Sequence, residues 1–97
     1  MTRSSASLPP TGALALDLEV LAEEASALGR AGRRVEETLA RLATAAAEAE
    51  REPCLRDAAE AVQHYFILRE MRGFRRHDDA VAIYRIPRAV LARLGAS

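Results

Sequence analysis

One stretch of the sequence decides the fold: residues 14–49, which read LALDLEVLAEEASALGRAGRRVEETLARLATAAAEA. Apolar and small residues recur along it every three or four positions, with no proline between them, at Leu14, Leu18, Leu21, Ala25, Leu28, Gly32, Val35, Leu39, Leu42, Ala46 and Ala49. This spacing puts them on one face of a helix. We therefore predict one long amphipathic helix with a narrow apolar stripe. It should stop near Glu52, because Pro53 disfavours helical geometry in the residue before it.

A helix of this length is too long for a compact monomer. It would span about 54 Å, whereas a compact chain of 97 residues is about 32 Å across. Burying each leucine or valine contributes about 1.5–3 kcal/mol, but ordering each backbone residue costs about 1–2 kcal/mol, so the stripe needs partners. The helix either breaks near Gly29 and Gly32 or stays whole under the cover of a second chain. We expect the intact helix and a homodimer, packed through Leu14, Leu18, Leu21, Leu28, Val35, Leu39 and Leu42.

The rest of the chain predicts a tail and three further helices. Residues 1–11 are rich in serine and proline, which predicts a disordered tail before a single helical domain at 12–97. A helix from about 53 to 72 is apolar around much of its circumference, so it should fold back on the first helix and lie centrally. Gly73 suits the left-handed residue that ends it. Two short helices follow, and no segment alternates like a strand, so we expect an all-α helical bundle.

The fold-back predicts which residues lie side by side. With a turn near Pro53, position 72 falls near position 32 of the first helix. Phe74 would then cover the notch left by Gly29 and Gly32.

Composition limits the possible partners. The net charge is zero, which gives no general attraction to nucleic acid or to an anionic membrane. Cys54 is the only cysteine, so there is no internal disulfide. Neither a signal peptide nor an apolar membrane span is expected. A cytoplasmic protein of bacterial type follows from this pattern.

Arginine provides the strongest candidate binding site. All 14 basic residues are arginine, and the fold-back would bring seven of them together: Arg30, Arg33, Arg34, Arg69, Arg72, Arg75 and Arg76. With aromatic residues nearby, such a cluster could bind phosphate, single-stranded nucleic acid or a partner protein. The alternative is that these arginines pair with Glu23, Glu24, Glu36 and Glu37 of the same or a second chain. The overall charge balance favours this alternative and disfavours a nucleic-acid partner.

Patterns that would indicate catalysis are weak. His77 and Asp78 could act as a base with a carboxylate, but they fit better as the start of a helix, where acids complement the dipole. His64 is expected to be partly buried, and Cys54 to be a small buried side chain. The sequence shows no zinc spacing, phosphate loop or nucleophile motif. We expect no catalytic residues, no metal, no cofactor and no enzyme.

Several short motifs resemble a small family of bacterial helical proteins without an assigned function. They are His64-Tyr65-Phe66, Arg69-Glu70, Gly73, His77-Asp78, Ile86-Pro87, the run from Val90 to Gly95, and the run from Ala25 to Arg33 in the first helix. This resemblance implies a compact helical domain and no mechanism.

Three functions are thus open at this level. The stripe favours a small interaction or assembly protein acting through homodimeric helix packing, with a further protein partner also open. A nucleic-acid-binding accessory protein that uses the arginine cluster is the alternative. An enzyme that uses His77 and Asp78 is the third.

Overall fold

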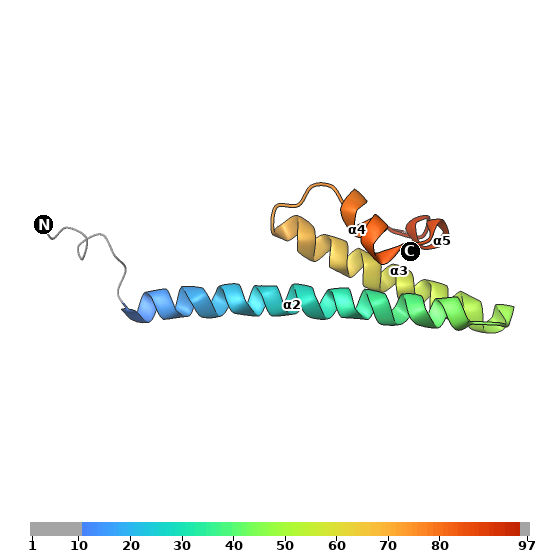
Figure 1. Ribbon diagram of the computed structural model, residues 1–97, viewed down its shortest axis with the longest axis horizontal. Coiled ribbons are helices and arrows are strands. Elements are labelled where there is room, and N and C mark those ends of the chain that lie inside the picture. The colour runs from blue at the N-terminus through green and yellow to red at the C-terminus, as the bar shows by residue number, and fades with distance from the viewer. Residues whose placement is uncertain (1–10, 96–97) are drawn as a thin grey trace, which may run out of the picture.

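The fold is all-α, as the sequence predicted. The computed structural model describes residues 11–95, in which four helices and no strand occur (Figure 1). They are α2 (Thr11–Thr44), α3 (Glu48–Met71), α4 (Asp78–Tyr84) and α5 (Arg88–Leu91). The predicted tail lies outside the described residues, except for Thr11, which is the first residue of α2.

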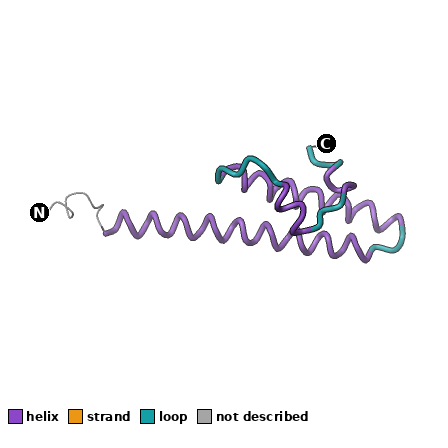
Figure 2. The backbone as a smooth tube through the Cα atoms, turned by 45° about the horizontal axis from the view of Figure 1, so that its top comes forward, coloured by secondary structure: helices purple, strands orange, loops and turns teal. Residues whose placement is uncertain are grey.

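Helix α2 is continuous through both of its interior glycines. Its 34 residues span about 51 Å, and it does not break at Gly29 or Gly32. Figures 1 and 2 show α3 folded back along one half of α2, while the other half extends beyond it. The radius of gyration is 19.1 Å, against about 12 Å for a compact chain of this size. The intact helix was therefore the correct alternative, and it does exceed the length of its own bundle.

The predicted end of the first helix was wrong. Helix α2 ends at Thr44, and α3 begins at Glu48 and contains Pro53. The proline lies in the second turn of α3, where its missing N–H leaves the carbonyl of Ala49 without a helical hydrogen bond. In the intervening turn, the N–H of Ala46 donates to Oε1 of Glu50 at 3.2 Å.

This earlier turn changes the register between the helices. A Cβ atom at Gly32 would lie 3.6 Å from the ring of Tyr65, and Arg72 pairs with Glu24. Position 72 therefore lies opposite residue 24 and not opposite 32. Tyr84 covers Gly32 in place of Phe74, which is 46% exposed. The notch does receive an aromatic side chain, but from α4.

The core lies between α3 and the C-terminal half of α2. Val35 and Leu42 are buried there, and Leu28 and Leu39 are partly buried. Ala80 of α4, Val90 of α5 and Ile86 between these two helices complete the core. The N-terminal half of the stripe is left uncovered: Leu14, Leu18 and Leu21 are 47%, 58% and 55% exposed. We call residues 14–23 the overhang.

Left-handed residues end both α3 and α4. After α3, Gly73 has φ 97°, and its N–H donates to the Glu70 carbonyl while that of Phe74 donates to the Arg69 carbonyl. After α4, Arg85 has φ 53° and the same pattern of bonds follows. The predicted roles of Gly73 and of Asp78, which opens α4, are confirmed. Pro87 precedes the first residue of α5 and does not itself belong to the helix.

Among the described residues, no helix is both long and apolar enough to cross a membrane.

The two helical glycines of α2 give a first test. Within one chain, Gly29→Ala should stabilise the fold by about 1 kcal/mol, because alanine favours helix and its Cβ would approach only a guanidinium nitrogen of Arg33, at 3.7 Å. Gly32→Ala should not, because its Cβ would lie 2.6 Å from the Tyr84 hydroxyl oxygen. In a Tyr84→Phe background, Gly32→Ala should regain the helical benefit. Urea unfolding of all variants measures this, and equal stabilisation by both alanines would contradict the packing.

Tyr84 also gives a test in alkaline solution. Burial, followed by the nearby Tyr65, raises the pKa of Tyr84 from 10.0 to about 12. The folded state therefore holds a proton that the unfolded chain releases earlier. This contribution to stability is complete below pH 10 and is lost as the pH rises towards 12. The fall in unfolding free energy over this interval should be smaller in Tyr84→Phe. An equal fall in both proteins would contradict it.

Candidate functional site

The side chain of Arg69 is at the centre of the best-ordered polar cluster. It comes from the last turn of α3 and is only 7% exposed. Its guanidinium carbon lies 4.7 Å from the centroid of the Phe74 ring and 5.8 Å from that of Tyr65. The cation is thus held between aromatic side chains on both sides of the turn that ends α3.

Three hydrogen bonds from Arg69 join α3 to the first turn of α4 and to the two residues before it. Its Nε donates to Nδ1 of His77 at 3.1 Å, and one Nη donates to the Arg76 carbonyl at 3.1 Å and to Oδ1 of Asp79 at 2.8 Å. Because Nδ1 of His77 accepts, Nε2 carries the ring proton and donates to Glu70 at 2.9 Å. The His77 ring also stacks on Phe66, with centroids 4.1 Å apart. We call Arg69 and these partners the Arg69 cluster.

The Arg69 cluster accounts for the residues that the sequence offered for catalysis. Both ring nitrogens of His77 are engaged, and Asp78 pairs with Arg76. The pKa of the Asp79 carboxyl lies below its ordinary value. The main cause is the hydrogen bond that it accepts from the N–H of Ala80, and the positive charge of Arg69 also lowers it. The bonds of Arg69 and Glu70 fasten the start of α4 to α3.

The predicted arginine group is not a single cluster. Arg72 pairs with Glu24 at 3.5 Å, and Arg30 pairs with Glu23 at 3.4 Å. Arg75 and Arg76 lie on the loop beside Arg69, where they line an open hollow together with Asp78 and Asp79. Arg33 and Arg34 are exposed further along α2, away from Arg72 because of the shifted register. Two of the four glutamates that were expected to pair with arginines, Glu23 and Glu24, thus form ion pairs with arginines of the same chain.

The overhang is the largest apolar surface that α2 exposes. Besides the three leucines of the stripe, Leu16 and Val20 are 56% and 52% exposed. The stripe did not include these two residues. Leu16 and Val20 are four residues apart, which indicates a second apolar edge of the helix. A pattern of only two residues, however, cannot be distinguished from chance by periodicity alone.

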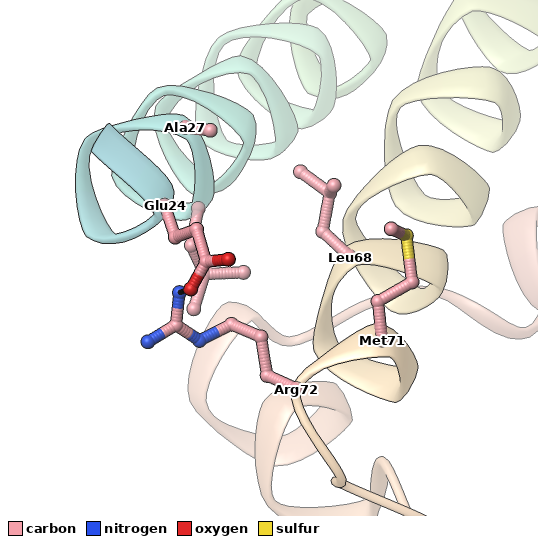
Figure 3. A pocket seen from close by; sticks show the side chains of 6 residues that line it. Glu24, Ala27, Leu68, Met71 and Arg72 are labelled. Carbon is pink, nitrogen blue, oxygen red and sulfur yellow. Dashed lines mark ion pairs between the residues drawn. The ribbon is translucent and has the colours of Figure 1, made fainter. Parts of the chain in front are cut away.

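A pocket lies where the overhang leaves α3. It has a volume of about 280 Å³, and Ala27 and Leu28 of α2 line it opposite Leu68 and Met71 of α3. The ion pair between Glu24 and Arg72 lies beside this space (Figure 3). The pocket is therefore the uncovered end of the contact between the two long helices.

A second groove runs between α2 and α4. Its α2 wall is formed by Glu36, Leu39, Ala40 and Ala43, and its other wall by the segment from Ile83 to Pro87. The volume is about 380 Å³. Ile83 is 75% exposed, and Arg85 is one of the residues that line the groove. We call this the α2–α4 groove.

The other candidate residues lie apart from these features. His64 is exposed, contrary to expectation, because it lies on the outer face of α3. Cys54 is half-buried against the core. No group of three or more His, Cys, Asp or Glu side chains suited to a metal ion occurs among the residues that the structure describes.

The contacts of the Arg69 cluster lead us to predict that lysine cannot replace arginine at position 69 without loss of stability. Arg69→Lys should lower the unfolding free energy by about 2 kcal/mol, since one ammonium group cannot reach His77, Arg76 and Asp79 together. Arg72→Lys is the matched control on the same helix, and its single exposed ion pair makes a change below about 0.5 kcal/mol the expected result. Urea unfolding compares them, and equal losses would mean that the cluster has no special role.

Comparisons with known proteins identify the family alone. Neither the curated proteins nor the solved structures gave a match. One family model matches residues 4–97, and it describes a family of unknown function, DUF6665. The resemblance to an uncharacterised helical family is thereby confirmed. The chain belongs to this family of unknown function, DUF6665.

Proposed function

We propose that this chain is a small assembly protein that forms a homodimer through α2. The exposed leucines of the overhang carry this proposal. A helix segment of this length is marginal in water without tertiary packing. Covering each leucine contributes about 1.5–3 kcal/mol, so a partner surface stabilises both the segment and the complex.

The charges of the overhang support a second copy as the partner. From Thr11 to Gly29 the chain carries Asp17, Glu19, Glu23 and Glu24 and no basic residue. A partner surface should therefore be apolar with basic residues at its edge. The same chain offers a largely apolar surface in the α2–α4 groove, which Arg85 lines together with one acidic residue, Glu36.

The arginines give less support to nucleic-acid binding. Arg30, Arg69, Arg72 and Arg76 all have carboxylate partners within the chain. These ion pairs would have to be exchanged for contacts with phosphate, at a cost that an unpaired basic patch does not carry.

Light scattering during size-exclusion chromatography tests the homodimer. The native chain should have twice its mass of 10.5 kDa. Replacing both Leu14 and Leu18 by glutamine should weaken dimerisation by more than about 100-fold, because each leucine occurs twice in the interface.

Ile67→Gln is the control, because Ile67 is 45% exposed but lies on α3, away from the overhang. It should leave the dimer intact. A native protein that is monomeric at every concentration would overturn the proposal, as would equal weakening by the control.

A further inference from the structure

We infer that the two copies pair antiparallel, so that the overhang of each α2 lies in the α2–α4 groove of the other. This inference rests on the proposed homodimer and names its interface. The contact is reciprocal, as a two-fold axis requires. The axis would pass close to Gly29, which is near the middle of α2.

The uneven charge along α2 favours this direction. The first half of the helix carries four carboxylates and no basic residue, whereas the segment from Arg30 to Thr44 carries four arginines and two glutamates. Parallel pairing would place the two acidic halves together. Antiparallel pairing over the full helix places each acidic half against the basic half of the other copy.

The overhang and the groove lie on the same face of α2. Residues three, four or seven positions apart lie on the same face of a helix. Such steps connect the overhang to the groove through Leu14, Leu18, Ala25, Gly29, Glu36, Ala40 and Ala43. The last three of these form the α2 wall of the groove. A two-fold axis that passes between Leu28 and Gly29 brings Leu18 of one copy opposite Leu39 of the other, and Leu14 opposite Ala43.

The centre of this arrangement has little to obstruct it. Gly29 has no side chain, and only a guanidinium nitrogen of Arg33 lies within 4 Å of where its Cβ would be. Ala25, one turn earlier, is small and exposed. Two α2 helices can therefore approach closely at the axis.

The competing arrangement pairs only the two overhangs, end to end. It would bring the three carboxylates of each overhang, those of Asp17, Glu19 and Glu23, near those of the other. The end-to-end pair would also have only one contact region. The full-length antiparallel pair has two, because each overhang lies in the groove of the other copy. Stable dimers bury about 1,200–2,000 Å², which favours the arrangement with two contacts.

Single cysteines in a Cys54→Ser background test the axis. A residue on the two-fold axis meets its own copy, and a disulfide forms only when the two Cα atoms approach to about 4.4–6.8 Å. Gly29→Cys should give a disulfide-linked dimer under mild oxidation, and Leu18→Cys should not. A mixture of Leu14→Cys and Ala43→Cys chains should give the linked heterodimer, in excess over either chain linked to itself.

The outcomes separate this inference from the proposed homodimer. Linkage of Leu18→Cys but not of Gly29→Cys indicates the end-to-end pair, and linkage of every single-cysteine chain indicates a parallel pair. Either result overturns the antiparallel groove contact while the homodimer stands. A native chain of monomer mass overturns both.

Small-angle X-ray scattering of the unmodified protein gives a second test that no substitution can disturb. The helical part of the overlapped dimer is about as long as one α2, or about 50 Å, and the end-to-end pair is about 30 Å longer. A dimer with the longer profile would contradict the inference.

Discussion

The unequal lengths of the two antiparallel helices determine the rest of the structure. Helix α2 has 34 residues and α3 has 24, so a return helix that starts at the shared turn must end before it covers its neighbour. The apolar stripe continues past that end without any change in its spacing. The half of the stripe that α3 covers holds the core, and the other half is a surface built like a core and left exposed.

The Arg69 cluster fixes the point at which the return helix ends. Helix α3 stops at Met71, and the chain must reverse within six residues to begin α4 at Asp78. This loop carries few apolar residues, so burial alone would hold it weakly. A buried guanidinium that binds a ring nitrogen, a carbonyl and a carboxylate replaces that missing packing. The same residues that could suggest catalysis are thus employed in closing the fold.

The sequence predicted those features that depend on local pattern. The long helix, its excess length, Gly73 and the start of α4 all follow from periodicity and capping, which act over a few residues. The turn between α2 and α3 did not, because it lies in a run of three alanines, and alanine has the highest helix propensity, so the local pattern predicts that the helix continues. Tertiary packing of Leu42 and Leu55 decides that case. The error in the turn then carried over to the register, to Phe74 and to the arginine group.

Arg85 shows where local backbone preference gives way. Its left-handed conformation is one that glycine adopts freely and that costs another residue about 1 kcal/mol. The equivalent position after α3 is occupied by glycine. Arg85 thus combines this local backbone cost with a place in the lining of the α2–α4 groove, the proposed docking site of the second copy. A rigid corner of the backbone presents the charge of Arg85 with less loss of freedom on docking than a flexible loop would.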